Sequence, residues 1–126
     1  MHHLAGPVGA ETGRWMLDRL VATAVRYGHP FAIVQLRLHH PDAVEPVADR
    51  VAMALRGADV LVGWAPDDLI ALLPDTDREG LVRASERIRA AVGDLPIEMG
   101  GAHWAGDTGD DLLDRAERAL AFQLRG

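Results

Sequence analysis

IALLPDTDREG, residues 70–80, joins the end of an apolar strand, a turn and the start of a helix in one short stretch. The apolar run ends at Leu73, and Pro74 interrupts it because proline has no backbone N–H to donate to a neighbouring strand. Thr76 or Asp77 can then cap a helix through a side-chain oxygen. Apolar residues at three- and four-residue steps continue that helix along its inner face: Leu81, Ala84, Ile88 and Val92. The stretch therefore predicts a strand, a turn and a helix in succession.

Three further strands are expected around this one. VLVGW (60–64) precedes LIALL (69–73), and residues 65–68 between them have turn chemistry, so the two runs should pair as a hairpin. FAIVQLRL (31–38) is rich in β-formers and alternates in its second half, which is typical of a strand buried mainly on one face. PIEMGGAHW (96–104) is a fourth candidate, in which two adjacent glycines favour a bulge or a close backbone approach.

Helices are predicted at both ends of the chain and between the strands. The first covers residues 12–27, with apolar residues at helical spacing: Trp15, Met16, Leu20, Ala24 and Tyr27. The second follows Pro41 and ends near Gly57, which is expected as its left-handed C-terminal residue. The last has Asp110 and Asp111 in its first turn. The order α, then β-α-β-β-α-β, then α predicts an α+β, ferredoxin-like domain, with a four-stranded antiparallel sheet and helices on one face.

Composition limits the class of protein. A chain of 126 residues with 48% apolar content suits a single domain spanning 1–126, in which we expect residues 1–10 to be flexible. Thirteen arginines against nineteen acidic residues give a net charge of -6, which argues against a nucleic-acid partner. The absence of cysteine excludes disulfides and thiolate metal sites. No apolar run approaches the roughly 20 residues of a membrane helix, so we expect a cytoplasmic protein with no membrane partner.

Several segments resemble GGDEF domains, the family that makes cyclic di-GMP from two GTP molecules. In chain order they are VRYGHPFAIVQLRL (25–38), ALRGADVLVGW (54–64), IALLPDTDREG (70–80), ASERIRAAV (84–92) and LLDRAERAL (112–120). Their order and spacing match the family from the first helix to the C-terminus. The resemblance implies the GGDEF fold, a nucleotide-cyclase-like sheet with helices packed on it. Function depends on the site residues, which differ from those of the family.

The family holds magnesium with an Asp-x-Asp pattern near the end of the first strand, and the matching positions here are Arg37 and His39. Arginine cannot ligate a cation, and it stays charged. If the first strand and the hairpin are neighbours, as the resemblance implies, Arg37 should lie close to Asp67 or Asp68 and form an ion pair where a metal would bridge carboxylates. The alternative is that Arg37 points to solvent from an exposed strand face.

Other departures affect the same catalytic site. The signature Gly-Gly-Asp-Glu-Phe turn is replaced by Ala65, Pro66, Asp67, Asp68 and Leu69. Both glycines that let the backbone approach the nucleotide are lost, and the proline also removes a donor. PDAVEPVADRV (41–51) is a shorter connection than the one that holds guanine in the family, and the family's phosphate-contacting lysine falls at Leu124. The resemblance therefore implies a degenerate active site, and we expect no catalytic residue, no metal and no cofactor.

A second, inhibitory-type site of the family has its residues in place. Its Arg-x-x-Asp motif matches Arg56 and Asp59, five residues before the signature turn, and a further arginine of the family matches Arg87. A guanidinium can donate to guanine O6 and N7, and a carboxylate can accept from the N1–H and N2–H₂ edge. The alternative is that Arg56 only caps the preceding helix, Asp59 is an ordinary turn residue and Arg87 is solvated.

These observations predict a catalytically inactive GGDEF-type regulatory module that acts through binding, either to cyclic di-GMP or to another protein. A structural or dimerisation domain with no nucleotide ligand is the alternative from a different class. An active diguanylate cyclase is the reading that the residues support least.

Overall fold

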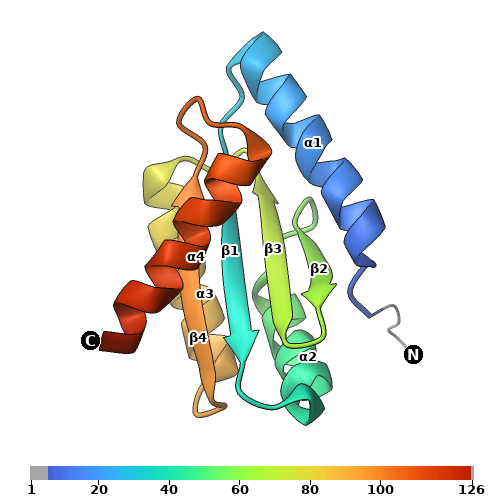
Figure 1. Cartoon of the computed structure of the whole chain (residues 1–126), viewed down its shortest axis with the longest axis vertical. Helices are drawn as coiled ribbons and strands as arrows, with labels where there is room; N and C mark the ends of the chain where they lie inside the picture. Colours follow the sequence, from blue (N-terminus) through green and yellow to red (C-terminus); the bar gives the residue numbers. More distant parts are fainter. Residues whose placement is uncertain (1–5, 126) are drawn as a thin grey trace.

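The computed structural model describes residues 6–125, and the side chains of residues 6–120. Within that part of the chain the elements follow the predicted order, α, then β-α-β-β-α-β, then α (Figure 1). They are α1 (Ala10–Tyr27), β1 (Phe31–Leu38), the 3₁₀ helix η1 (Pro41–Ala43), α2 (Val44–Ala54), β2 (Val60–Ala65), β3 (Asp68–Pro74), α3 (Arg78–Val92), β4 (Ile97–His103) and α4 (Gly109–Arg125). The α+β class expected from the sequence is confirmed.

The strands form one antiparallel sheet in the order β2-β3-β1-β4. β1 is central and pairs with β3 on one side and with β4 on the other. β2 and β3 form the hairpin that the turn residues predicted. This strand order is the ferredoxin-like arrangement, and it places the end of β1 beside the β2–β3 turn.

Helices cover both faces of the sheet, so the prediction of helices on one face is wrong. α2 and α3 lie behind the sheet in Figure 1, and α1 and α4 lie in front of it. Ala32 and Val34 of β1 pack in the first layer, and Phe31 and Ile33 pack in the second. Successive side chains of a strand point to opposite faces, and β1 is apolar on both, so each face requires a cover.

α1 is rotated relative to the helix face expected from the apolar spacing. Leu17 and Ala24 are buried, whereas Trp15 and Tyr27 are 60% and 62% exposed. The reason is a close approach at Gly13, where a Cβ atom would lie 2.2 Å from Cγ1 of Val62 on β2. A glycine that faces the sheet carries no apolar signal, so the hydrophobic pattern alone misplaced the inner face.

β4 is a regular strand, because Gly100 and Gly101 pair in register with β1. The predicted bulge is therefore wrong, and the alternative of a close backbone approach is confirmed. A Cβ atom on Gly100 would lie 2.6 Å from the backbone nitrogen of Leu120 and 2.7 Å from the carbonyl oxygen of Ala116. Gly100 thus lets α4 rest directly on the sheet, whereas Gly101 faces Leu81 of α3 on the other side.

The ends of the helices agree only in part with expectation. Asp77 caps α3 by accepting a hydrogen bond from the Gly80 N–H at 2.8 Å, and Gly93 ends that helix with φ 63°. α2 is preceded by η1 and stops at Ala54, after which Leu55 is extended. Gly57 is therefore not the left-handed residue of a helix C-terminus, because the chain has already left the helix.

The start of the chain was expected to be flexible over residues 1–10. Residues 1–5 lie outside the described part, but Val8 forms a parallel bridge with Val62 at the edge of β2. Its N–H donates to the Leu61 carbonyl at 3.0 Å, and its carbonyl accepts from the Gly63 N–H at 2.8 Å. Among the described residues, no helix combines the length and the apolar character that crossing a membrane requires.

Candidate functional site

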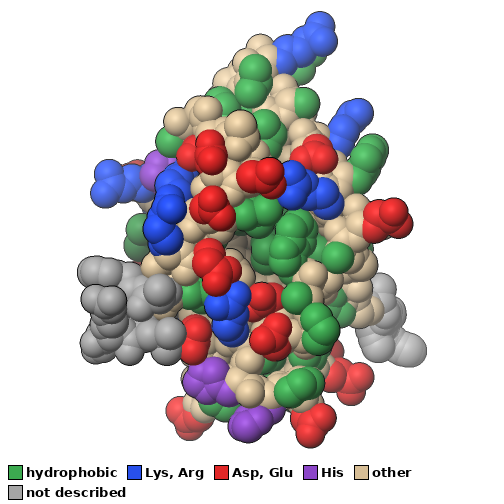
Figure 2. Space-filling model, viewed as in Figure 1, with side chains coloured by type: hydrophobic (Ala, Val, Ile, Leu, Met, Phe, Trp, Pro, Cys, Tyr) green, Lys and Arg blue, Asp and Glu red, His purple; other side chains and the backbone are tan. Residues whose placement is uncertain are grey.

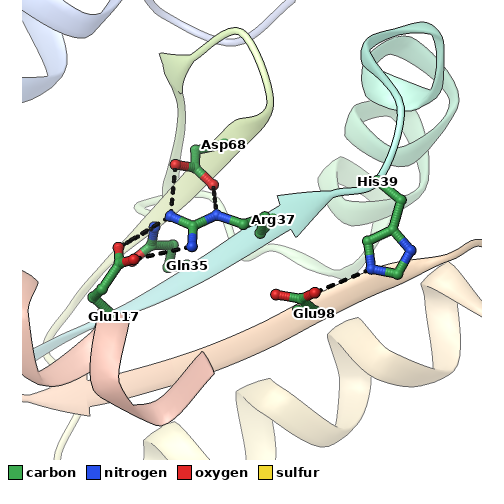
Figure 3. Close-up of polar contacts among 6 residues, drawn as sticks. All are labelled: Gln35, Arg37, His39, Asp68, Glu98 and Glu117. Carbon is green, nitrogen blue, oxygen red and sulfur yellow. Dashed lines mark hydrogen bonds and ion pairs between the residues drawn. The ribbon is translucent and has the colours of Figure 1, made fainter. Parts of the chain in front are cut away.

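Arg37 and Asp68 are directly opposite each other in the register of β1 and β3. The guanidinium donates from Nε to Asp68 Oδ1 at 2.9 Å and from Nη2 to Oδ2 at 3.1 Å (Figure 3). Both carboxylate oxygens are used, and the Asp68 side chain is only 10% exposed. The predicted pair between Arg37 and a hairpin carboxylate is confirmed, and its partner is Asp68.

A second carboxylate completes the surroundings of Arg37. Glu117 of α4 accepts from Nη1 at 2.9 Å and from Nη2 at 3.0 Å, and Gln35 Nε2 donates to it at 3.3 Å (Figure 3). Sequence reasoning missed Glu117, because nothing in the helix pattern says which strand residue it faces. Gln35, a buried polar residue in an otherwise apolar part of β1, was the available signal.

The side chains of this cluster, which consists of Arg37, Asp68, Glu117 and Gln35, interact mainly with one another. Hydrogen bonds to Asp68 and then to Glu117 raise the pKa of the Arg37 guanidinium. The hydrogen bond from Arg37 is the main cause that lowers the pKa of Glu117, and burial opposes it. A permanent cation thus sits between two carboxylates with all three of its nitrogens engaged. All four carboxylate oxygens of Asp68 and Glu117 are therefore bonded to Arg37.

The other residues of the expected former active site lie around the same end of the sheet. His39 follows β1, and its Nε2 lies 3.1 Å from Glu98 Oε2 (Figure 3). Ala65, Pro66 and Asp67 are exposed at the hairpin turn, and Asp67 contributes its backbone carbonyl to the Leu38 N–H. The side chain of Leu124 lies outside the described residues. The described part of the chain contains no group of three or more His, Cys, Asp or Glu residues arranged to hold a metal ion.

An ion pair at the start of α4 helps to position Glu117. Arg115 donates to both carboxylate oxygens of Asp107 at 2.9 Å and also to the His103 carbonyl. Burial raises the pKa of Asp107, but the hydrogen bonds from Arg115 and from the Ala105 N–H outweigh it and leave that pKa lowered. The pair connects the end of β4 to α4, the helix that carries Glu117. This connection fixes the position of α4 along the sheet.

The three residues of the expected inhibitory-type site are close in the fold but do not point into one cavity. Arg56 Nη2 donates to Thr76 Oγ1 at 2.8 Å and contacts the Pro74 carbonyl at 3.5 Å. Arg87 Nε donates to the Ala54 carbonyl at 3.3 Å. Both guanidinium groups therefore bond to other parts of the protein, Arg56 near the end of β3 and Arg87 at the end of α2, although the Arg56 side chain stays 55% exposed.

Asp59 is the unusual member of the set. Its Oδ2 accepts from the Arg56 N–H at 2.8 Å and lies 3.6 Å from Arg56 Nε. Its side chain is 0% exposed, and its Oδ1 has no hydrogen-bond partner among the described residues. A buried carboxylate oxygen without a partner is uncommon in a folded protein and costs free energy.

No family model and no curated protein sequence matches the chain. Solved structures do match. The GGDEF domain of DgcB from Caulobacter crescentus, in complex with c-di-GMP, superimposes with a TM-score of 0.84 and 16% identity, over 100% of this chain and 94% of that one. The GGDEF domain of FimX from Pseudomonas aeruginosa gives 0.84 and 14%, over 94% and 90% of the two chains. The fold is that of a GGDEF domain.

Diguanylate cyclase SiaD from Pseudomonas aeruginosa, in complex with its activator SiaC, shares this GGDEF fold. Its TM-score is 0.80 at 18% identity, and the match covers 93% of this chain and 55% of the SiaD chain. The GGDEF fold expected from the sequence is thus confirmed over nearly the whole chain. In this GGDEF fold the two candidate sites lie at opposite ends of β2, which is about 20 Å long for six residues.

Proposed function

We propose that this chain is a GGDEF-fold regulatory module without cyclase activity, which acts through binding. The observation that carries the proposal is the Arg37 cluster. Arg37 occupies a position where, by the resemblance, the family places a metal-holding carboxylate. It bonds to Asp68, a carboxylate of the signature turn. Two-metal phosphoryl transfer needs free carboxylates to hold magnesium, and a guanidinium bonded to Asp68 and Glu117 repels that ion.

The test is incubation of the purified chain with GTP and Mg²⁺, followed by chromatography for cyclic di-GMP and for any other nucleotide product. The proposal expects none above a protein-free control. Formation of cyclic di-GMP that is lost in Asp68→Asn would refute it, because that carboxylate would then be serving catalysis.

The ligand that we propose is cyclic di-GMP, bound through Arg56 and Asp59, which line one cleft; Arg87 lies outside that cleft and would have to leave the Ala54 carbonyl to take part. Oδ1 of Asp59 supports this, because it is a buried acceptor for which the described residues supply no donor. A guanine presents two N–H groups along one edge and acceptors on the other, which suits a carboxylate beside a guanidinium. The exposed Arg56 guanidinium can turn toward such a ligand at the cost of its hydrogen bond to Thr76 and the longer one to the Pro74 carbonyl.

Calorimetric titration with cyclic di-GMP tests this ligand. We expect binding by the unchanged chain, and Asp59→Asn should weaken it by about tenfold or more because one charged acceptor is lost. Asp49→Asn is the matched control, since Asp49 lines the same cleft on α2 and its side chain makes no described hydrogen bond. Absence of heat from the unchanged chain at high ligand concentration would favour the alternative, a domain kept for packing or dimerisation.

A further inference from the structure

The carboxylate of Asp59 is sealed from solvent at the edge of the sheet. Its side chain is 0% exposed, although Asp59 lies in the loop between α2 and β2, directly before the strand. One oxygen is bonded to the Arg56 N–H, and the other has no partner among the described residues. The side chain therefore combines burial with an acceptor that has no donor among the described residues.

A cleft of about 300 Å³ borders Asp59. Its walls come from three places: the segment before α1, the inner side of α2 and the start of β2. Gly6, Pro7 and Val8 line it from the segment before α1, and Arg56 and Asp59 line it from the loop between α2 and β2. This volume is at the lower limit of the range that holds small ligands, about 300–1,000 Å³. A cyclic dinucleotide needs the cleft to widen.

Residues Gly6–Gly9, which we name the strap, form the wall that is held least firmly. In Figure 1 this part of the chain runs beside β2 before α1 begins. It is joined to β2 by one parallel bridge with two backbone hydrogen bonds, from Val8 to Leu61 and from Gly63 to Val8. Val8 adds a partly buried apolar contact. Segments with so few bonds open locally at much lower free energy than core strands do.

We infer that the strap is displaceable and controls access to Asp59. With the strap paired, Asp59 keeps an unsatisfied buried oxygen. With the strap released, a planar base edge that carries N–H donors can satisfy that oxygen and replace the strap as its cover. Strap pairing and ligand binding at Asp59 then compete. The apparent affinity for the ligand equals the intrinsic affinity multiplied by the fraction of molecules in which the strap is open. The ligand part of this inference rests on the proposed function.

A reversible lock tests the competition in a single molecule. A Cβ atom on Gly63 would lie 3.9 Å from Cβ of Pro7, which is within the range of about 3.5–4.5 Å for Cβ atoms joined by a disulfide. The chain contains no cysteine, so Pro7→Cys with Gly63→Cys introduces one defined pair. Cyclic di-GMP should bind the reduced protein and bind the oxidised protein about tenfold more weakly or not at all. Equal affinities in the two states would overturn the strap and leave the proposed function standing.

A second experiment needs no ligand. It tests whether the strap controls access to Asp59 even if cyclic di-GMP binds neither the oxidised nor the reduced protein. Asp59→Cys places a thiol under the strap, and its rate of maleimide labelling reports access. Val8→Pro removes the N–H that bonds to Leu61, whereas Gly9→Pro is the matched control. Gly9 has φ -70° and donates no described hydrogen bond, so proline fits there.

The expected result is labelling about tenfold faster in the Val8→Pro background than in the Gly9→Pro background, because the strap is released in the first alone. Equal labelling rates would overturn the strap whatever the ligand result. Faster labelling with no cyclic di-GMP binding would retain the strap and retire the proposed ligand.

Discussion

Two carboxylates near opposite ends of β2 differ in their hydrogen bonding. At the far end, Asp68 has both oxygens bonded to Arg37, which is held in turn by Glu117. At the near end, Asp59 has one oxygen bonded and the other unsatisfied. Both carboxylates are almost fully buried, so burial does not distinguish them. The difference is whether the described residues supply a donor for each carboxylate oxygen.

From this difference we expect Asp68 to contribute to the stability of the fold and Asp59 to contribute to ligand binding. A guanidinium between two carboxylates is complete by itself, and it gains nothing from a further ligand. A buried oxygen without a donor is a standing cost that a ligand with N–H groups can remove. We therefore expect substitutions at the Arg37 end to change mainly stability, and substitutions at the Asp59 end to change mainly ligand binding.

Gly100→Ala should have the largest effect on stability. The added methyl group meets backbone atoms of α4 at 2.6 and 2.7 Å, so the helix must move away from the sheet. Overpacking of this kind costs roughly 3 kcal/mol, and it also pulls Glu117 away from Arg37. Urea denaturation measures the loss. An unfolding free energy within error of the unchanged protein would show that α4 does not depend on this close approach.

Arg37→Met should come next. The change leaves Asp68, only 10% exposed, facing Glu117 without a cation between them. Because the cluster is partly open to solvent, we expect a loss of about 2 kcal/mol rather than the larger cost of a fully buried pair.

A double-mutant cycle with Asp68→Asn isolates the Arg37–Asp68 pair. The double variant should recover part of the loss, with a coupling of about 1 kcal/mol. Additive losses would mean that the ion pair contributes nothing beyond the packing of its side chains.

Glu117→Gln should have a smaller effect that depends on pH. The pKa of Glu117 is lowered in the folded protein, chiefly by its hydrogen bond with Arg37, so the carboxylate stabilises the fold above its unfolded pKa of about 4.3. That contribution is lost as the pH falls through the lowered folded value. Glu117 is 52% exposed, so solvent screening limits the effect to a few tenths of a kcal/mol.

Unfolding of the unchanged protein and of Glu117→Gln should therefore differ at pH 7 and converge at acid pH. A difference that grows as the pH falls would carry the wrong sign for this account.

Asp59→Asn should have the smallest effect on stability. The remaining side-chain oxygen can still accept from the Arg56 N–H, and the lost charge was only partly paired. We expect a change below about 0.5 kcal/mol in the free energy of unfolding. A loss comparable with that of Arg37→Met would erase the contrast between the two ends, because Asp59 would then be a structural residue.

Much of the architecture could be predicted because the relevant signals are local. The hairpin follows from the turn between two apolar runs, and the Asp77 cap follows from a short polar side chain before a helix. The pairing of Arg37 with Asp68 required only that the first strand and the hairpin be neighbours. What escaped prediction depends on contacts between distant segments. Glu117 reaches Arg37 from α4, and the strap lines the same cleft as Asp59 although the two are far apart in the sequence.

The same limit explains the misplaced face of α1. Gly13 faces the sheet because β2 comes within contact distance, and no property of the helix sequence alone encodes that neighbour. The prediction that helices cover only one face of the sheet was wrong for a related reason. β1 is apolar on both faces, and the second face is covered by α1 and α4, the helices at the two ends of the chain.

We propose that Arg37 closes the position where, by the resemblance, the family holds a metal ion, and a Mn²⁺ titration followed by electron paramagnetic resonance tests this proposal. The spectrum of free Mn²⁺ should keep the same amplitude in the presence of the unchanged protein as in buffer, because Asp68 and Glu117 are already bonded to a cation. A fall in amplitude with added protein that disappears in Asp68→Asn would contradict the account.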